Sequence, residues 1–473
     1  MEMEPLPNQL PWLQDWTRTI KDSFGKEANQ SPNYYINDPW SLVSTSAVHS
    51  FQTGTGNDIF TTILPSLEAA QHEIIFVTCF WAASPSLSKL SQTLLSLSDR
   101  VLAEGRSRVR VRLCLSSLSL FQKLFQTSSL AGKTYPPSSW VSKLGLPPPE
   151  QLQGLDLTVK SIFVKPFSVM HPKFIIIDHK IVWLPSCNVS WEEWFEGCIR
   201  LSGPIVGQFV RFYDFFWKRG DEIWPALDIP TIESSSSAID EGMNASALES
   251  GINFGQEGND VQSVFLPSPH HLNPRFRPFS WQNCPAAPRT PLNVFLLKLF
   301  MNAQKEIYVQ TPNLTAPPVL KALLNALRRG VDVTVLTSER LMILEQLVTA
   351  GTTTSCCVTK LIRRYKALRQ PGSAYYRAYI DVEAALRREP GTLKVSFYQP
   401  RADGRPGEPV QSHLKLTTVD NEWLVLGSGN MDRASWYTSQ ELGVAFNSKE
   451  VTEQVMELVR KALEGRQKTA YSG

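Results

Sequence analysis

Two stretches of the chain share one pattern of apolar and polar positions. In each, apolar residues at helical spacing lead through an Ala-Gln-x-Glu-Ile segment, at residues 70–74 and 303–307, into a β-rich run. A second helical pattern then closes at Gly105 in one copy and at Gly330 in the other, and an alternating strand follows each. This succession of helices and strands predicts an α/β fold built from two homologous halves.

The repeat also sets the domain boundaries that we expect. An N-terminal extension would cover residues 1–37, the first half residues 38–228 and the second half residues 260–473. The segment 229–259 between the halves is rich in Ser, Gly and acidic residues. Such a composition is typical of a flexible linker or a surface excursion.

The second half carries an additional basic segment, at about residues 343–390. Its cations are Lys360, Arg363, Arg364, Lys366, Arg369, Arg377, Arg387 and Arg388, interleaved with Tyr365, Tyr375, Tyr376 and Tyr379. Two interpretations stay open for it. It could be a solvated helix face, or a cover over an active site that attracts phosphate or anionic headgroups.

A third pair of matching segments carries the candidate chemistry. The shared pattern is His-x-Lys-x4-Asp followed by Ser-x-Asn. It comprises His171, Lys173, Asp178, Ser186 and Asn188 in the first half, and His413, Lys415, Asp420, Ser428 and Asn430 in the second. Because side chains alternate along a strand, the His and Lys of each copy lie on one face, and each Asp falls at a turn before a returning strand.

The doubled motif resembles the phospholipase D superfamily. That family includes phospholipases, cardiolipin and phosphatidylserine synthases, nucleases and DNA-end-processing phosphodiesterases. The resemblance spans both halves and is strongest at residues 171–196 and 413–441. It implies two α-β-α domains packed as a pseudo-dimer around one active site, so a monomer with an internal pseudo-two-fold is expected. One departure is Pro185, which stands where the second copy has Gly427 and lacks a backbone N–H.

These residue types suit the cleavage of a phosphodiester. A neutral imidazole can form a covalent phosphohistidine, and a second imidazole can protonate the leaving alkoxide. By analogy with the family we assign these roles to His171 and His413 respectively, although the symmetry of the sequence leaves the reverse open. Lys173 and Lys415 would neutralise the nonbridging oxygens as charge develops on them.

The remaining candidate residues would support this chemistry. The resemblance implies that Glu196 and Glu441, downstream of the two motifs, accept hydrogen bonds from the histidines and fix their tautomers. The serines and asparagines of the Ser-x-Asn pairs would bind the substrate phosphate: Ser186, Asn188, Ser428 and Asn430. Asp178 and Asp420 complete the candidate catalytic set, with a structural role near the hairpin turn preferred for them.

Residues outside the motifs are interpreted more simply. The other histidines, His49, His72, His179, His270 and His271, have no partner motif and are read as surface or hydrogen-bonded core residues. The tryptophans near the motifs could pack in the core or line an acyl-chain or headgroup pocket: Trp183, Trp191, Trp194 and Trp436.

Composition narrows the function without deciding it. The formal net charge is only +3, so any attraction to phosphate must come from local placement of Lys and Arg. No acidic, His or Cys group has metal-ligand spacing, and we expect no metal and no cofactor. The first residues carry glutamates and no apolar run, and no stretch is long enough to span a bilayer. We therefore expect an intracellular protein, cytoplasmic or at the membrane periphery, and not a secreted one.

The leading hypothesis is a phosphodiesterase of the phospholipase D type that hydrolyses or transphosphatidylates a phospholipid. A nuclease or nucleic-acid end-processing enzyme is the second candidate, because the basic segment 360–388 and its tyrosines could hold a strand. A catalytically idle phosphate-binding protein is the third. The sequence does not specify the lipid headgroup or the acceptor.

Overall fold

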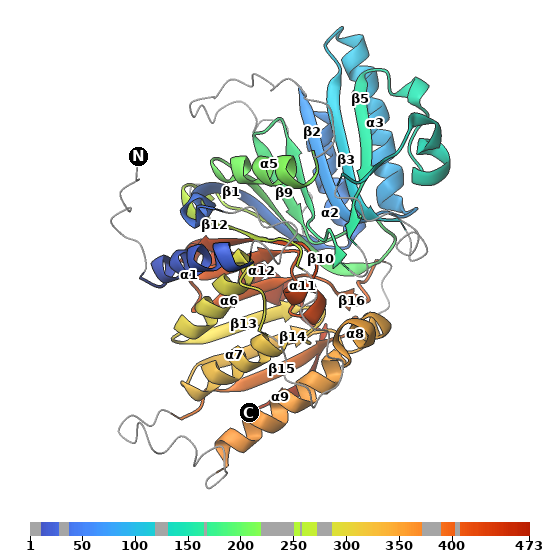
Figure 1. Cartoon of the computed structure of the whole chain (residues 1–473). Coiled ribbons are helices and arrows are strands. Elements are labelled where there is room, and N and C mark those ends of the chain that lie inside the picture. The colour runs from blue at the N-terminus through green and yellow to red at the C-terminus, as the bar shows by residue number, and fades with distance from the viewer. Residues whose placement is uncertain are drawn as a thin grey trace.

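The computed structural model describes residues 11–27, 37–118, 131–164, 168–218, 250–255, 258–271, 286–370, 389–402 and 407–473. Within them the chain forms two α/β halves stacked on each other (Figure 1). The halves are homologous α-β-α domains, as the repeat predicted, and they pack as a pseudo-dimer, as the resemblance implied.

The first half contains a mixed sheet flanked by helices. Its main elements are β1 (Val43–Gly54), α2 (Gly56–Glu68), β2 (Glu73–Phe80), α3 (Pro85–Ala103), β3 (Val109–Ser117), β4 (Lys133–Thr134), β5 (Leu155–Ser161), β8 (Phe174–Ile177), β9 (Ile181–Pro185), β10 (Trp194–Ser202) and α5 (Ile205–Phe216). A separate small ribbon is made by β6 (Phe163–Val164) and β7 (Ser168–Val169), and short helical turns lie at Pro39–Leu42, Pro137–Ser139, Trp140–Leu144 and Pro149–Gln151.

The second half repeats this succession. Its elements are β11 (Gly251–Asn253), β12 (Val261–Ser268), α6 (Pro291–Asn302), β13 (Glu306–Thr311), α7 (Pro317–Arg328), β14 (Asp332–Thr337), α8 (Ile343–Ala350), α9 (Thr354–Arg369), β15 (Leu393–Tyr398), β16 (Gln411–Ser412), β17 (Leu416–Val419), β18 (Trp423–Gly427), α11 (Arg433–Tyr437), β19 (Glu441–Asn447), α12 (Lys449–Ala462) and β20 (Gln467–Ser472). An N-terminal helix, α1 (Pro11–Glu27), precedes both halves.

Strand order is the same in the two halves. The first sheet runs β1-β10-β9-β8-β2-β3-β5 and the second runs β12-β19-β18-β17-β13-β14-β15, with parallel pairing among the last three strands of each. The leading strands β1 and β12 pair antiparallel with each other, from Val43 opposite Val264 to Ser46 opposite Val261. This seam makes the two sheets continuous, and the antiparallel pairing of equivalent strands is what a pseudo-two-fold requires.

The repeated Ala-Gln-x-Glu-Ile segment has a structural cause. The carboxylate of Asp178 accepts hydrogen bonds from the backbone N–H groups of residues 71, 72 and 73, at 2.6–2.8 Å. Asp420 does the same for residues 304, 305 and 306, at 2.7–3.0 Å. Each aspartate has a positive φ, 51° and 58°, as does the residue after it, which forms the tight turn between β8 and β9 or between β17 and β18.

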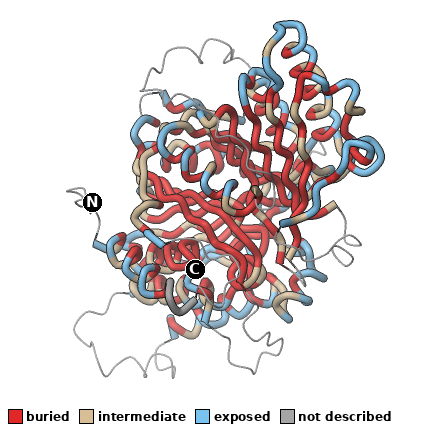
Figure 2. The backbone as a smooth tube through the Cα atoms, turned by 45° about the horizontal axis from the view of Figure 1, so that its top comes forward, coloured by how far each residue is buried: buried red, intermediate tan, exposed pale blue. Residues whose placement is uncertain are grey.

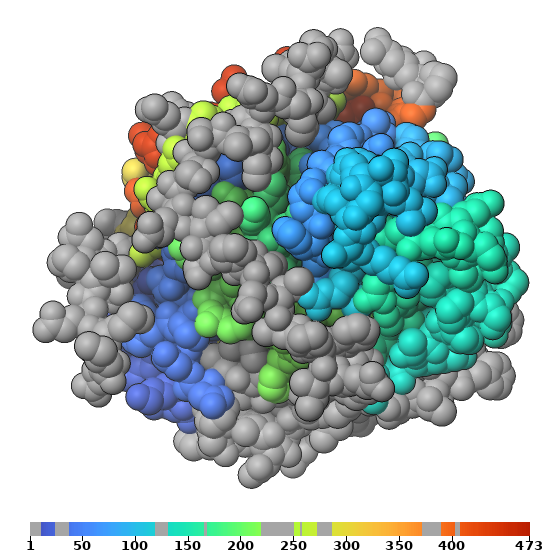
Figure 3. Space-filling model, turned by 90° about the horizontal axis from the view of Figure 1, so that it is seen from above, coloured from blue at the N-terminus to red at the C-terminus, as the bar shows by residue number. Residues whose placement is uncertain are grey.

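The buried residues follow the sheets, and exposed residues lie on the outer helices and turns (Figure 2). Helix α1 adds to the core of the second half, because Trp16 is fully buried and its indole Nε1–H donates to Pro291 O at 3.1 Å. Seen from above, α3 and the segment after β4 lie side by side on the face of the first half (Figure 3).

The expected boundaries stay predictions, although two observations bear on them. Strand β11 falls inside the expected linker 229–259 and pairs with β1, while residues 219–249 lie outside the described residues. The expected N-terminal extension 1–37 contains α1, which packs on α6 of the second half. Among the helices that the structure describes, none combines the length and the apolar character needed to cross a bilayer.

Candidate active site

The two motif histidines lie directly before equivalent strands, β8 and β17. The apolar residues of both strands are buried, which fixes the strands and the extended residues that lead into them. Lys173 and Lys415 are almost fully buried, with exposed fractions of 1% and 4%. Burial of a charged group is costly unless it has partners, so both lysines must serve something near them.

Each histidine is paired with the glutamate of the other half. His171 Nδ1 lies 2.8 Å from Glu441 Oε2, and His413 Nδ1 lies 2.7 Å from Glu196 Oε1. The backbone repeats this exchange, because His171 N donates to Gln440 O at 3.0 Å and His413 N donates to Phe195 O at 2.9 Å. A carboxylate only accepts, so each Nδ1 carries the hydrogen and each Nε2 keeps a lone pair.

The glutamates are themselves held by serines. Ser428 Oγ donates to Glu441 Oε2 at 2.5 Å and Ser435 Oγ donates to Glu441 Oε1 at 2.6 Å. In the first half, Ser186 Oγ donates to Glu196 Oε2 and accepts from Gly197 N at 2.9 Å. The single hydrogen of each hydroxyl is thus given to a glutamate, and the phosphate-binding role of Ser186 and Ser428 stays a prediction.

The asparagines of the two Ser-x-Asn pairs differ from each other. Asn188 Oδ1 accepts from Phe80 N at 3.2 Å, so its NH₂ group is the part left to donate elsewhere. Asn430 Nδ2 donates to Asp432 Oδ2 at 3.0 Å, and Asn430 Oδ1 is buried with no hydrogen-bond partner among the residues that the structure describes. The phosphate-binding role of both asparagines stays a prediction.

The lysines make different contacts too. Lys415 Nζ lies 2.8 Å from Nε2 of His413, whose lone pair can accept from the ammonium. Lys173 Nζ donates to the carbonyl oxygen of His171 at 3.0 Å. An ammonium therefore stands beside each histidine, and in the second half it bonds directly to the ring.

Burial governs the ionisation of the site. It lowers the pKa of His171 to about 4 and the pKa of His413 to about 3, while the glutamates partly oppose the shift and the lysines add to it. Burial also lowers the pKa of Lys415 to about 7. Burial alone would raise the pKa of each glutamate, but its interactions with the paired histidine and the hydrogen bonds from serine hydroxyls outweigh burial, and the pKa is lowered. Both imidazoles are therefore neutral at pH 7, beside carboxylates that are ionised.

The two motifs also influence each other electrostatically across the halves. The charge of Lys415 lowers the pKa of His171, and the charge of Lys173 lowers the pKa of His413. The two rings are not equivalent, however. The His171 side chain is 14% exposed, whereas that of His413 is 4% exposed and has the ring of Trp194 at a centroid distance of 4.7 Å.

Asp178 and Asp420 belong to the turns at the far ends of β8 and β17, and among the described residues their carboxylates accept hydrogen bonds from the backbone that leads into β2 and β13. Their place in the catalytic set stays a prediction. They fix the turn that carries each motif strand, which agrees with the structural role preferred for them.

Sequence reasoning missed two residues near the site. Ser435 lies on α11 and holds Glu441, and only its position three residues after Asp432, the residue that caps this helix, could have hinted at it. His270 is fully buried, with Nε2 at 2.8 Å from Met170 Sδ and Nδ1 against Ser168 Oγ. Ser168 in turn donates to Thr438 O at 2.6 Å, so His270 links the segments that precede His171 and Glu441.

The other residues set aside from the motifs have structural places. His179 Nε2 lies 2.7 Å from Glu73 Oε2, and Asn421 Nδ2 donates to Glu306 Oε1 at the equivalent turn. Trp183 and Trp436 are buried core residues, whereas Trp191 is 65% exposed.

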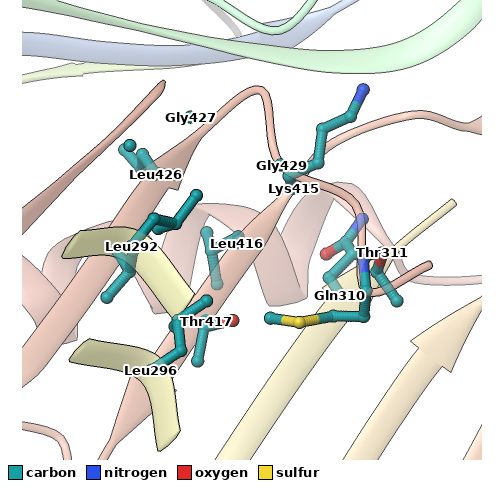
Figure 4. A pocket seen from close by; sticks show the side chains of 13 residues that line it. Leu292, Leu296, Gln310, Thr311, Lys415, Leu416, Thr417, Leu426, Gly427 and Gly429 are labelled. Carbon is teal, nitrogen blue, oxygen red and sulfur yellow. Dashed lines mark hydrogen bonds between the residues drawn. The ribbon is translucent and has the colours of Figure 1, made fainter. Parts of the chain in front are cut away.

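A small pocket lies behind the second motif, with leucines, glycines, Thr417 and Lys415 in its wall (Figure 4). A second small pocket lies between the halves and includes Ser186 and Lys415. Neither is lined by a motif histidine, and Figure 4 shows the Lys415 side chain directed away from Leu292 and Leu296. The histidines, rather than these pockets, define the candidate reaction centre. In the part of the chain that is described, no cluster of His, Cys, Asp or Glu could hold a metal ion.

Comparison with known proteins agrees with this architecture. Residues 296–462 match a family model described as cardiolipin synthase, PLD-like domain. The fold is similar to that of phosphatidylserine synthase from Haemophilus influenzae Rd KW20, with a TM-score of 0.53 and 14% identity over 91% of this chain and 89% of that one. Nuc, a phospholipase D family member from Salmonella typhimurium, matches 44% of this chain and 98% of its own, with 18% identity and a TM-score of 0.28. No curated protein sequence matches the chain.

Residues 296–462 therefore match a domain of the phospholipase D type. The two halves together share the fold of that phosphatidylserine synthase.

Proposed function

We propose that the chain is a phosphodiesterase of the phospholipase D type that acts on a phospholipid through a phosphohistidine. The observation that carries this proposal is the exchange of histidine and glutamate partners between the halves. It leaves two neutral imidazoles with lone pairs on Nε2 in a site that also holds two buried lysines. These groups are the ones needed for nucleophilic attack on phosphorus followed by proton transfer.

His171 is the better nucleophile of the pair. Its ring is the more exposed one, and among the described residues no other side chain bonds to its Nε2 as Lys415 bonds to Nε2 of His413. In the first step His171 Nε2 forms a bond to phosphorus and the bond to the leaving alcohol breaks. In the second step water or another alcohol attacks, the N–P bond breaks and His171 is restored.

The leaving alkoxide needs a proton, and we assign it to the Lys415–His413 pair. The imidazole of His413 is neutral at rest, but the neighbouring ammonium donates to its Nε2 at 2.8 Å and has a pKa of about 7. A bound phosphodiester adds negative charge, which favours the protonated form of His413, and the leaving oxygen can then take this proton from Nε2. His413 then takes a proton from the incoming water or alcohol.

A phospholipid is the favoured substrate. The family model that matches residues 296–462 is that of cardiolipin synthase, and the fold is similar to that of a phosphatidylserine synthase. Both names refer to proteins that build phospholipids. The same chemistry would also cleave the phosphodiester of a nucleic acid. Because the basic side of α9 could bind such a substrate, oligonucleotides are included in the test.

The test compares His171→Ala and His413→Ala with wild-type protein on phospholipid vesicles, on oligonucleotides and on a chromogenic phosphodiester. Added ethanol separates transfer from hydrolysis. We expect both variants to lose turnover and the wild-type protein to incorporate phosphate label at His171. His72→Ala is the matched control, because His72 is exposed and only its backbone N–H bonds to Asp178. Undiminished turnover in either motif variant, or cleavage of oligonucleotides alone, contradicts the proposal.

A further inference from the structure

Helix α8 exposes apolar residues and buries a polar one, which is the reverse of what a surface helix of a soluble domain usually does. Exposed apolar residues cover it and the residue before it: Met342 (38%), Ile343 (39%), Leu344 (80%), Leu347 (46%) and Val348 (52%). The residue of α8 that is buried is a polar one, Gln346. Scattered exposed leucines need no explanation, but a contiguous apolar group on one short helix marks a binding surface.

The helix is nevertheless held firmly. Gln346 Nε2 donates to Leu341 O at 2.6 Å, and Gln346 Oε1 accepts from Thr354 N at 2.6 Å and from Thr354 Oγ1 at 3.0 Å. These bonds tie α8 to the loop before it and to the start of α9. The apolar side chains are therefore presented outward by a fixed scaffold and not by a frayed segment.

The position of α8 connects it to the reaction centre. It follows β14, whose carboxyl end leads to Ser338, and Ser338 Oγ donates to Ser412 O at 3.1 Å, next to His413. Helix α8 also packs against α11, which carries Ser435, the partner of Glu441 (Figure 1). The apolar surface thus lies at the same edge of the second sheet as the catalytic histidine.

Helix α9, directly after α8, supplies positive charge. Its exposed side carries Lys360, Arg363, Arg364, Lys366 and Arg369, and residues 351–370 contain no Asp or Glu. Lys366 and Arg369 lie over the rings of Tyr471 and Tyr365. Lys360, Arg363 and Arg364 have no ion-pair partner among the residues that the structure describes.

We infer that α8 and the basic side of α9 together dock the protein on the surface of an anionic lipid membrane. Apolar side chains would enter the boundary between headgroups and acyl chains, while the cations attract the negative surface. A second copy of the chain fits less well, because a two-fold interface centred on α8 would bring two α9 helices of equal charge together. The inference rests on the proposed function, since a membrane at this edge would present its phospholipids to His171 and His413.

The experiment measures binding of the full chain to vesicles of phosphatidylcholine with and without phosphatidylglycerol, and its turnover of a soluble chromogenic phosphodiester. We expect wild-type protein to bind the anionic vesicles more tightly, and less so as salt is raised. Leu344→Asp with Leu347→Asp should weaken this binding at least tenfold, and Lys360→Ala with Arg363→Ala and Arg364→Ala should abolish the preference for anionic lipid. Leu102→Asp is the matched control, because Leu102 is 52% exposed in the first half.

Turnover of the soluble substrate separates this inference from the proposed function. All of these docking variants should keep the turnover of the soluble substrate, which also shows that they fold. The milder variant Leu344→Ser with Leu347→Ser should give an intermediate loss of vesicle binding. Unchanged binding by the α8 variants overturns the inference. So does a wild-type dimer in sedimentation that the α8 variants dissociate while vesicle binding persists. A third outcome would refute the proposed function alone. In it the docking variants lose vesicle binding as predicted, but the His171→Ala variant keeps its turnover of the soluble substrate.

Discussion

Replacing Glu441 by Gln tests the cross-half pairing most directly. The carboxylate is 1% exposed and accepts hydrogen bonds from His171, Ser428 and Ser435. Glutamine has the same shape but no charge, and its NH₂ group must stand where one of these donors now points. If it faces His171, the ring takes the hydrogen on Nε2 and loses the lone pair needed for attack.

The magnitude follows from the lost bond. A hydrogen bond to a charged group is worth about 1.5–3 kcal/mol, and each 1.4 kcal/mol is a factor of about ten in rate. We therefore expect kcat/KM of Glu441→Gln to fall roughly 10- to 150-fold, and further where the wrong tautomer prevails. In proton NMR the downfield Nδ1–H signal of His171 should disappear, while that of His413 remains.

Glu196→Gln is the natural comparison, because it disturbs His413 and not His171. If His413 protonates the leaving group, this variant should be slow with an alcohol leaving group and nearly normal with nitrophenolate, which needs no proton. Glu441→Gln should be slow with both. A folded Glu441→Gln protein with wild-type kcat/KM, or one that loses the His413 signal instead, would refute the pairing and the reasoning drawn from it.

Three further predictions follow from the same contacts. The kcat/KM should rise as pH increases through about 4, where His171 becomes neutral, and fall above about 7, where Lys415 loses its charge. Lys415→Arg should move this fall at high pH to a higher pH, and a fall that stays in place would exclude Lys415 as its origin. Asp178→Ala should lower the free energy of urea unfolding by about 3 kcal/mol, because three backbone N–H groups lose their acceptor. Molecules that fold should keep their turnover, and a large loss of kcat in folded protein would instead show that this aspartate is catalytic. Gly427→Ala should destabilise by about 1–3 kcal/mol, since its Cβ would lie 2.3 Å from Leu442 O, whereas Gly207→Ala, with nothing within 4 Å, should be neutral or stabilising in the same assay.

Much of the architecture is readable from the sequence because it is repeated and locally encoded. The period of the apolar residues predicts two α/β halves, and the structure confirms them with one strand order used twice. The spacing of His171 and Lys173 around β8, and of their counterparts around β17, follows from the alternation of a strand, which depends only on the backbone. The doubled motif is also enough to predict the superfamily.

Local spacing does not decide which glutamate meets which histidine. Glu196 follows the first motif and Glu441 the second, yet each binds the histidine of the opposite half. The docking of β1 on β12 and the pairing of Trp194–Phe195 with Gln411–Ser412 bring these segments together. Such contacts depend on the shapes of two folded sheets, and no periodicity along the chain records them.

The roles of the polar residues around the motifs are likewise tertiary. Ser186 and Ser428 look like phosphate ligands in the sequence, but in the folded chain the nearest acceptor for each hydroxyl is a buried glutamate. The order of residues along α8 does not show whether its apolar side chains face the core or the solvent, because only burial distinguishes a core face from an exposed one. Thus the sequence by itself determined the repeated frame and its reactive groups. The partners of those groups were decided by tertiary structure, because a hydrogen bond between distant segments exists only once the sheets that carry them have docked.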